Sequence, residues 1–244
     1  MPSLEGKRAL ITGGSRGIGA EVAKQLAERG VRIAINYVAA QDRAEQTRAS
    51  LKGDGHVLVQ GDAFTHEGLA QIVKGAREGL GGLDIVISNA GWTQFGAFND
   101  LESVSDDDWI RCYQTNVMSH LWLMQEVKDE LIANKGSFVI SASVAGLKPS
   151  GSSMAYSVSK AGTVHLAKSL AKACAPARVN AVAAGVMLTE WSKGFTEEHV
   201  QKVKQTNALN MICEVEDVAS QYVSLCENKS ITGQIIEVSA GFQL

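Results

Sequence analysis

A strand, a glycine-rich turn and a helix follow one another near the amino terminus, and this order constrains the fold more than any other feature. Residues 8–11 are an apolar run of strand character, Gly13, Gly17 and Gly19 lie in the turn, and apolar residues recur at helical spacing over 22–27. Glycines let the backbone approach a pyrophosphate, and the N–H groups at the helix start favour an anion. The spacing Gly-x3-Gly-x-Gly differs from the commoner G-x-G-x-x-G. A turn without a ligand is the alternative, but the flanking strand and helix favour phosphate binding.

Strands alternate with helices along the rest of the chain. The predicted strands are apolar runs at residues 9–12, 32–36, 57–60, 85–88, 137–141, 179–183 and 235–238. The predicted helices cover residues 18–28, 43–52, 66–80, 107–132, 155–173 and 215–226. Continuous apolar runs are typical of parallel strands covered on both faces. Repeated strand–helix units predict the α/β class, as a single-domain doubly wound Rossmann fold with a seven-stranded parallel sheet over residues 1–244.

Composition and charge exclude several classes of function. The 244 residues are 45% hydrophobic and 20% charged, as in an ordinary soluble globular protein. The net charge of −3 gives no electrostatic reason to expect nucleic acid or an acidic membrane as a partner. No run has transmembrane length, and no charged-then-apolar signal begins the chain. The cysteines are far apart without a CxxC pair, which predicts reduced thiols in the cytoplasm and no metal site: Cys112, Cys174, Cys213 and Cys226.

Tyr156 and Lys160 lie four residues apart, so on a helix they share one face. A free tyrosine has a pKa of about 10, which makes it a poor proton donor or acceptor at neutral pH. A neighbouring ammonium stabilises the phenolate and lowers this pKa, so we expect Lys160 to activate Tyr156. The pair alone occurs by chance on many helices, and its meaning depends on the other motifs.

Together the motifs resemble the short-chain dehydrogenase/reductase family. Residues 12–19 resemble the cofactor turn of that family, and Asn89, Ala90 and Gly91 resemble its signature after the fourth strand. Four residues fall in order where the family has its catalytic tetrad: Asn116, Ser143, Tyr156 and Lys160. The resemblance extends over residues 6–241, and within the family the chain looks most like ketone reductases related to 3-oxoacyl carrier-protein reductase.

The resemblance implies a nicotinamide dinucleotide bound at the carboxyl edge of the sheet. The expected cofactor-binding residues are Gly13, Ser15, Arg16, Gly17, Ile18, Gly19, Asn36, Asp62, Ala63, Asn89, Ala90, Gly91, Tyr156, Lys160, Val186 and Thr189. Asp62 would bond the adenine amino group, Lys160 would also hold the nicotinamide ribose, and Thr189 would bond the carboxamide or a phosphate. Residues 89–91 would lie against the adenosine ribose.

The end of the second predicted strand favours NADPH over NADH. An NAD enzyme usually has an acidic residue about 20 residues after the glycine turn, where it bonds the ribose 2′-OH. Here the strand ends in Ile35, Asn36 and Tyr37, without an acid, and Arg16 in the turn could meet a 2′-phosphate. Arg16 facing only solvent is the alternative. We expect that Asn36→Asp would shift preference toward NADH by charge repulsion.

The tetrad suits reduction of a ketone, or oxidation of a secondary alcohol in reverse. Hydride transfer to a ketone builds negative charge on oxygen, which Ser143 can stabilise and Tyr156 can protonate. Lys160 would stabilise the resulting phenolate, and Asn116 would hold a water that leads to Lys160. A loop cap for Ser143 and a helix-bending role for Asn116 are the alternatives.

The sequence does not name the substrate, but it suggests a small apolar or aromatic carbonyl compound. Residues expected around the pocket are Trp92, Phe95, Met154, Met187, Trp191, Phe195 and Met211. Core or subunit-interface packing is an equal alternative for several of them. Residues 190–210, here called the lid segment, are expected to order on binding. The apolar carboxyl-terminal strand needs cover at the sheet edge, so we expect a homo-oligomer, a tetramer or a dimer as is common in the family.

One departure from the family pattern keeps a second function open. Ala184 stands where the family usually has proline before Gly185, so the loop over the nicotinamide is less restrained. The rival interpretation is a cofactor-binding protein without redox activity, either a cyclase or isomerase or a nucleotide-sensing module.

Overall fold

The computed structural model describes residues 3–242 and residue 244, and among these it contains one seven-stranded parallel sheet. The strands are β1 (Arg8–Ile11), β2 (Arg32–Tyr37), β3 (Val57–Gln60), β4 (Ile85–Ser88), β5 (Ser137–Ser143), β6 (Arg178–Ala184) and β7 (Ile235–Val238). Their order in the sheet is β3-β2-β1-β4-β5-β6-β7, and every neighbouring pair is parallel. The predicted Rossmann fold is therefore confirmed, with all seven strands where the apolar runs lie.

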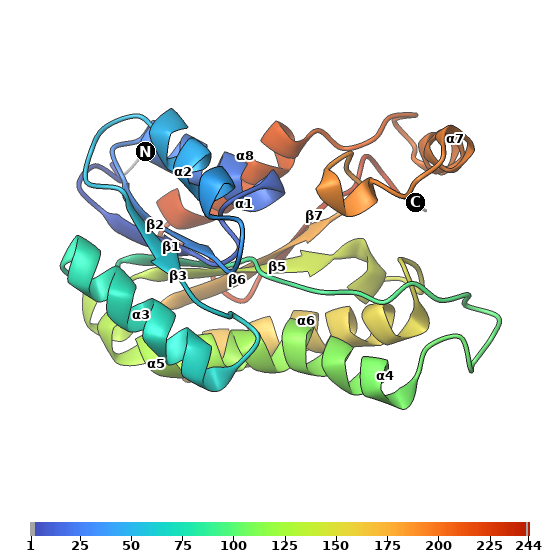
Figure 1. The fold of residues 1–244 in the computed structure, drawn as a ribbon, viewed down its shortest axis with the longest axis horizontal. Coiled ribbons are helices and arrows are strands. Elements are labelled where there is room, and N and C mark those ends of the chain that lie inside the picture. The colour runs from blue at the N-terminus through green and yellow to red at the C-terminus, as the bar shows by residue number, and fades with distance from the viewer. Residues whose placement is uncertain (1–2, 243) are drawn as a thin grey trace.

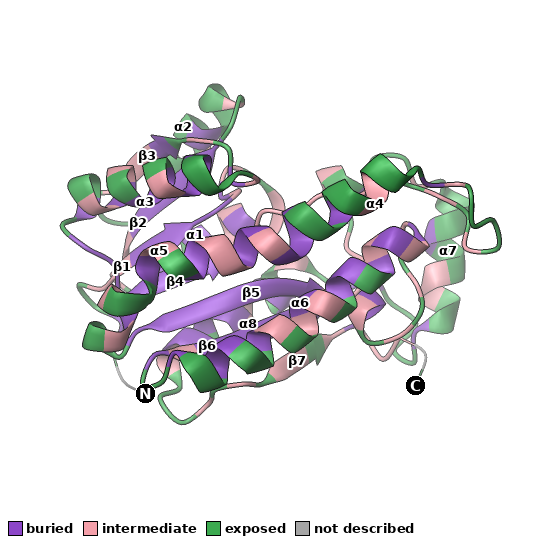
Figure 2. Ribbon diagram, turned by 90° about the horizontal axis from the view of Figure 1, so that it is seen from below, coloured by how far each residue is buried: buried purple, intermediate pink, exposed green. Residues whose placement is uncertain are grey.

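Helices cover both faces of this sheet (Figure 1). On one face lie α1 (Gly17–Ala27), α2 (Gln41–Ser50) and α8 (Val215–Glu227). The other face, which is nearest the viewer in Figure 2, carries α3 (His66–Leu80), α4 (Asp106–Tyr113), α5 (Ser119–Asn134) and α6 (Met154–Ala173). Shorter elements are η1 (Gln114–Met118), η2 (Val144–Gly146), η3 (Glu190–Ser192) and α7 (Glu197–Thr206). Among the described residues, no helix is both long and apolar enough to span a membrane.

Alternate residues of each strand pack into two separate apolar cores. In β1, Leu10 belongs to the core under α3, α5 and α6, whereas Ala9 and Ile11 belong to the core under α1 and α8. Each strand is thus apolar on both sides, as the continuous apolar runs predicted. Because both faces are covered, only the ends of the strands can offer an open site.

The structure divides the single helix predicted over residues 107–132. A π-helical turn, η1, separates α4 from α5, and Asn116 lies in its middle. The Asn116 carbonyl accepts a hydrogen bond of 2.5 Å from Thr163 Oγ1 on α6, and its side chain bonds the backbone of Trp92. These tertiary contacts compensate for the locally altered helix pattern, which the periodicity of the sequence cannot reveal. Such π-turns often occur at functional sites.

β5 and β6 are longer at their carboxyl ends than predicted, and this matters for the site. β5 extends to Ser143 and β6 to Ala184, and these two residues are in register with each other. Ala184 is also in register with Val238 of β7. The replacement of the family's proline therefore leaves the pairing of the strand intact on both sides.

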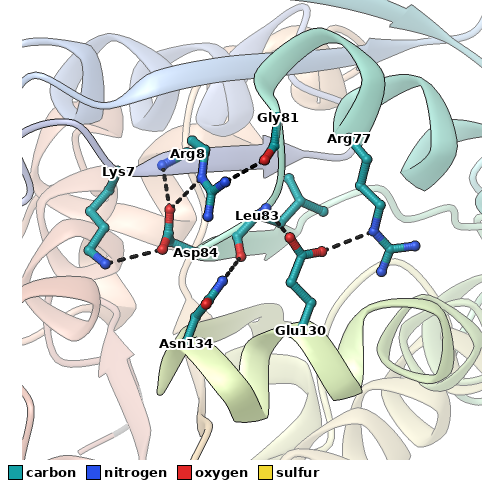
Figure 3. A network of polar contacts seen from close by, with 8 residues as sticks. All are labelled: Lys7, Arg8, Arg77, Gly81, Leu83, Asp84, Glu130 and Asn134. Atoms are coloured by element: carbon teal, nitrogen blue, oxygen red, sulfur yellow. Dashed lines mark hydrogen bonds and ion pairs between the residues drawn. The ribbon is translucent and has the colours of Figure 1, made fainter.

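A polar network closes the opposite, amino-terminal edge of the sheet (Figure 3). The Asp84 carboxylate accepts hydrogen bonds from Lys7 Nζ at 3.1 Å and from Arg8 Nε at 2.8 Å. Glu130 on α5 accepts from the Leu83 N–H at 2.6 Å and from Arg77 on α3 at 2.9 Å. The network joins two strands to two helices far from the expected cofactor edge, so its contribution is to stability.

Candidate active site

The carboxyl ends of β1 and β4, where the strand order reverses, are fastened together by side chains. Thr12 Oγ1 accepts hydrogen bonds from the backbone N–H groups of Asn89 and Ala90 at 2.9 and 3.1 Å. The Asn89 amide donates in return to the carbonyls of Thr12 and Gly13. Asn89 Oδ1 accepts from Ser141 Oγ on β5, which also bonds the Tyr222 hydroxyl on α8. The glycine turn is thus held at the switch point where ligands of doubly wound sheets bind.

Gly19 lets the first helix lie directly against this turn. A Cβ atom at Gly19 would lie 2.6 Å from the Gly13 carbonyl oxygen and 2.8 Å from Asn89 Nδ2. Any larger residue would force the helix away from the turn. The start of α1 would then no longer face the switch point, so this glycine is required for the geometry of the edge.

Asn36 supports the turn from below and does not face outward. Its side chain is buried, Oδ1 accepts from the Gly13 N–H at 3.1 Å, and Nδ2 donates to the carbonyls of Val59 and Gly61. The expectation that Asn36 borders the ribose and sets cofactor choice by charge is therefore not supported by its position. The amide is needed because it donates and accepts at once, which a buried aspartate cannot do.

Ser143, Tyr156 and Lys160 converge beyond the end of β5. Tyr156 lies in the first turn of α6, and Lys160 Nζ is 5.7 Å from the centroid of its ring. Lys160 is buried and donates to the Ser141 carbonyl at 2.8 Å. Ser143 Oγ accepts from the Ala145 N–H and donates toward the Ala184 carbonyl at 3.5 Å. The spacing of Tyr156 and Lys160 therefore does place them side by side on one helix face.

The electrostatics of this cluster differ from the expectation for Tyr156. Burial raises the pKa of Tyr156 to about 12, although a hydrogen bond with Ser143 acts in the lowering direction. Burial also lowers the pKa of Lys160 to about 8. Desolvation thus shifts the pKa of Tyr156 in the direction opposite to the one that the sequence suggested. In this arrangement the phenol keeps its proton at neutral pH, which suits a proton donor.

Asn116 and Gly91 complete the cluster from the α4–α5 side. Asn116 is fully buried, and its amide donates to the Trp92 carbonyl at 2.8 Å and to Ser159 Oγ at 3.1 Å. Its Oδ1 accepts from the Trp92 N–H at 3.2 Å. A Cβ at Gly91 would lie 3.0 Å from Asn116 Oδ1 and 3.7 Å from Lys160 Nζ. Gly91 therefore leaves open the space between these two side chains.

The remaining predicted cofactor residues line the same edge, in different ways. Asp62 is exposed and caps its own loop through the Phe64 N–H, whereas Ala63 is buried and can offer only its backbone. Thr189 caps η3, with Oγ1 accepting from the Trp191 N–H. The others follow β1 or β6: Ser15 accepts from Thr47, Ile18 packs on the α1–α8 core, and Val186 accepts from the Cys213 N–H.

The predicted pocket residues divide between the site and the core. The Trp191 ring, 48% exposed, lies 6.2 Å from the Tyr156 ring, centroid to centroid. Trp92 packs on a small core of α4 and α6 and lies under the Arg111 guanidinium. Met187 packs on the core of α1 and α8. Trp191 thus lies near Tyr156 as a pocket residue would, whereas Trp92 and Met187 pack on core residues.

The other pocket candidates are more open, and the lid segment is anchored at its end. Phe95 is exposed, Met154 is half-buried at the start of α6, and the Phe195 ring packs at a tilt against His199 of α7. Met211 lines a cavity of about 220 Å³ between the end of the lid segment and α8. After α7, Asn207 pairs with Phe242 in an antiparallel bridge, which fixes the segment to the carboxyl-terminal residues.

Sequence reasoning missed five residues that shape this edge. They are Thr12, Arg43, Ser141, Glu190 and Tyr222. Thr12 lies inside the turn motif and could have been identified as the partner of residues 89 and 90, but the other four carry no local signal. In the part of the chain that the structure describes, no cluster of histidine, cysteine, aspartate or glutamate could hold a metal ion.

Comparisons with known proteins agree with this geometry. Residues 13–243 match the family model described as enoyl-(acyl carrier protein) reductase. The chain is 32% identical over 238 residues to carbonyl reductase family member 4 of Danio rerio, covering 97% of this chain and 98% of that protein. It is 28% identical over 245 residues to the Staphylococcus epidermidis 3-oxoacyl-(acyl-carrier-protein) reductase FabG, covering 98% and 99%.

Solved structures show the same similarity over the whole chain. A short-chain dehydrogenase/reductase from Serratia marcescens has a TM-score of 0.91 at 30% identity and covers 100% of both chains. The Pseudomonas aeruginosa RhlG/NADP active-site complex has a TM-score of 0.90 at 28% identity, covering 99% of this chain and 98% of that one. The full-length matches in sequence and in structure place this chain in the short-chain dehydrogenase/reductase family.

Proposed function

We propose that the protein is an NADPH-dependent carbonyl reductase that converts a small apolar or aromatic ketone to a secondary alcohol. The observation that carries the proposal is the cluster of half-buried Ser143 and Tyr156 with buried Lys160, beside the turn at the switch point. A reductase needs a proton donor at the point where a dinucleotide meets its substrate. This cluster supplies one at the edge where such cofactors bind.

The residues at this edge fit a nicotinamide dinucleotide. Close packing of α1 on the turn holds the start of the helix, a site that favours anions, at the switch point, and Gly91 leaves space beside Lys160. Arg16 and Arg43 add positive charge near the turn. When bound, the reduced nicotinamide supplies the hydride that the carbonyl carbon accepts.

The side chains of this chain then handle the proton and the charge. Tyr156 donates its phenolic proton to the oxygen of the substrate, on which negative charge develops. Ser143 donates a hydrogen bond to that oxygen and stabilises it. The Lys160 ammonium stabilises the phenolate that remains, and Asn116 fixes the backbone of Trp92, the residue after Gly91.

NADPH is the proposed cofactor because of the residues that end β2 and follow β1 and β2. β2 ends without an acidic residue, and Arg16 and Arg43 follow β1 and β2. Arginine binds phosphate through several parallel donors. The NADP complex among the similar structures is in accord with this choice.

A panel assay tests the proposed function. Ketones that range from small aliphatic to aromatic compounds are offered with NADPH and, separately, with NADH, and oxidation of the cofactor is followed at 340 nm (a property of the reduced nicotinamide). We expect reduction of aromatic or bulky apolar ketones and a higher kcat/KM for NADPH. Tight NADPH binding without turnover of any ketone would favour the cyclase, isomerase or sensor alternative.

We also propose that the protein is a homo-oligomer in a reducing compartment, the cytoplasm. A surface groove of about 460 Å³, here called the α4–α5 groove, is lined by Trp109, Ile110, Tyr113, Gln114, Met118 and Trp122. Ile110 is 64% exposed and Tyr113 51% exposed, which favours burial against a second copy in a two-fold interface. All four cysteines are buried free thiols, in accord with a reducing environment.

A further inference from the structure

Three charged side chains from distant parts of the chain meet above the glycine turn. Glu190 Oε1 is 2.5 Å from Arg43 Nη1, and Glu190 Oε2 is 3.5 Å from Arg16 Nε. Arg16 belongs to the turn after β1, Arg43 to the first turn of α2 after β2, and Glu190 to η3 after β6. Since β6 is separated from β1 by two strands, this contact carries the start of the lid segment across the carboxyl edge of the sheet.

Two further observations describe the contact. A Cβ at Gly17 would lie 3.9 Å from Thr189 Cβ, so the residue before Glu190 also approaches the turn. Glu190 Oε2 is inaccessible to solvent and accepts no hydrogen bond, so the carboxylate leaves part of its bonding capacity unused. An unsatisfied buried acceptor weakens the state that contains it. Glu190 Oε2 is thus held only by its ion pair with Arg16, without a hydrogen bond.

We propose that Glu190 is an internal competitor for the 2′-phosphate of NADPH, which occupies Arg16 and Arg43 until that phosphate displaces it. This inference rests on the proposed function, because it assigns the two arginines to the 2′-phosphate. A phosphate carries more charge than a carboxylate and three acceptor oxygens, so it can satisfy both guanidinium groups. Its arrival releases η3 and frees the lid segment, whereas NADH, which has no 2′-phosphate, leaves the contact in place.

The contact is weak enough to be displaced. The side chains of Arg16, Arg43 and Glu190 are 63%, 44% and 32% exposed, and ion pairs of this kind contribute little to stability. We therefore expect Glu190 to lower the affinity for a 2′-phosphate about three- to tenfold, which corresponds to the energies typical of one or two such pairs.

Calorimetric titration with two fragments tests this directly, without turnover. Adenosine 2′,5′-bisphosphate and 5′-AMP differ only in the 2′-phosphate. Glu190→Gln should bind the bisphosphate about three- to tenfold more tightly than wild type and 5′-AMP within about twofold. Glu197→Gln is the matched control, because it makes the same change in the lid segment on a carboxylate that accepts from Gln201.

A mutant cycle identifies the arginines as the shared partners. Arg16→Gln and Arg43→Gln should each weaken bisphosphate binding. When Glu190→Gln is added to the variant that carries both arginine substitutions, it should have no further effect on bisphosphate binding. In wild type, hydrogen exchange of residues 190–206 should increase with the bisphosphate and stay unchanged with 5′-AMP. Both results follow only if carboxylate and phosphate exclude each other.

Three outcomes would overturn the inference. They are equal bisphosphate affinity in wild type and Glu190→Gln, weaker bisphosphate binding in Glu190→Gln, and weaker 5′-AMP binding in that variant, which would show Glu190 holding the ribose 2′-OH. These outcomes are distinct from failure of the proposed function. A protein that reduced no ketone would refute the reductase activity and leave the fragment titrations to decide the role of Glu190.

Discussion

At the scale of single residues, burial decides the protonation state of the groups near the site. Tyr156 is kept protonated because desolvation of the phenolate raises its pKa to about 12. His120, on α5, is fully buried with one ring nitrogen 2.6 Å from Ser88 Oγ and the other without a hydrogen bond. Burial, with repulsion from the Lys160 ammonium, lowers the pKa of His120 to about 3. Burial therefore favours the uncharged form of both Tyr156 and His120 at neutral pH.

Tyr156→Phe should keep cofactor affinity and remove most of the ketone reduction. The ring remains while the proton is lost, and acid catalysis of this kind contributes about 100- to 10,000-fold to the rate. Single-turnover kinetics with a ketone from the panel would measure the loss, and titration with NADPH would measure the affinity. Tyr113→Phe, a change at an exposed tyrosine on α4, is the control. A Tyr156→Phe enzyme with more than about a tenth of wild-type kcat would show that Tyr156 is not the proton donor.

His120 should make the stability of the protein fall in mild acid. Its folded-state pKa of about 3 lies below the value of about 6.5 in the unfolded chain, so unfolding takes up a proton between these limits. The free energy of unfolding should therefore be highest above pH 6.5 and fall by about 1.4 kcal/mol for each pH unit below it. Urea titrations at pH 7, 6 and 5 would measure this.

His120→Gln is the comparison, because glutamine can still bond Ser88 but does not titrate. The variant should lack this part of the pH dependence, so the difference in unfolding free energy between the two proteins should shrink as pH falls. Parallel curves over this range would mean that His120 takes up a proton as readily in the folded protein as in the unfolded chain.

At the scale of elements, the glycine turn is positioned by its neighbours more than by its own residues. Asn36 on β2 holds the Gly13 N–H, and Asn89 after β4 holds the carbonyl of Gly13. The π-turn η1 presents Asn116 to Trp92 in the same way, through a side chain that bonds a backbone segment. Side-chain amides near the ends of strands and in the π-turn thus fix the loops that are expected to contact the ligand.

Asn36→Asp should destabilise the fold and should not produce preference for NADH. The carboxylate would face the carbonyls of Val59 and Gly61 without a donor, and each unsatisfied buried group costs about 1–3 kcal/mol. Thermal unfolding would show the loss, and kcat/KM for both cofactors should fall together. Gln60→Glu makes the same amide-to-acid change at an exposed position of β3. A stable Asn36→Asp protein that prefers NADH would restore the role suggested by the sequence.

At the scale of the whole molecule, the two edges of the sheet have different tasks. The carboxyl edge carries open loops and the proposed chemistry, whereas the amino-terminal edge is closed by the Asp84 and Glu130 network in Figure 3. Burial alone would raise the pKa of Asp84, but hydrogen bonds from Arg8 and Lys7 and their charges together lower it. The ionised carboxylate is thus a net contributor to the folded state.

Asp84→Asn should therefore lower stability and leave cofactor affinity unchanged. Hydrogen bonds to a charged group contribute about 1.5–3 kcal/mol each. A neutral amide at position 84 would weaken the bonds from Lys7 and Arg8, because it removes the negative charge that strengthens them. Because the folded-state pKa of Asp84 lies below the value of about 3.9 that is usual for an aspartate, the difference from wild type should be complete above about pH 4 and disappear as pH falls further. Urea unfolding at several pH values would measure it. Glu78→Gln, in an exposed pair on α3, should change little, and an equal loss there would contradict the assignment.

The proposed oligomer gives a prediction at the same scale. Ile110→Asp places a charge in the α4–α5 groove and should lower the molar mass measured by sedimentation velocity, because burial of an unpaired carboxylate opposes association. Leu101→Asp makes a comparable change at a residue that is 77% exposed outside the groove, and should leave the mass unchanged. A monomeric wild type, or an unchanged Ile110→Asp oligomer, would exclude this surface as the contact.

The sequence by itself determined the sheet, nearly all of its helices and the place of the catalytic candidates. Apolar runs, helical periodicity and the glycine turn are local patterns, and local backbone preferences decide them. The spacing of Tyr156 and Lys160 fixed a shared helix face for the same reason. Repeated strand–helix units predict a parallel sheet, and ligands of such sheets bind at the carboxyl ends of the strands, so the sequence also predicted the edge that holds the site.

Only the tertiary structure decided how these residues are solvated and which distant side chains meet. The burial that raises the pKa of Tyr156, the inward position of Asn36 and the break in the helix at Asn116 all depend on packing between elements. Arg43 and Glu190 are 147 residues apart, and no periodicity relates them. Local spacing encodes the direction of a side chain along its own element, but desolvation and ion pairing depend on what other elements bring beside it.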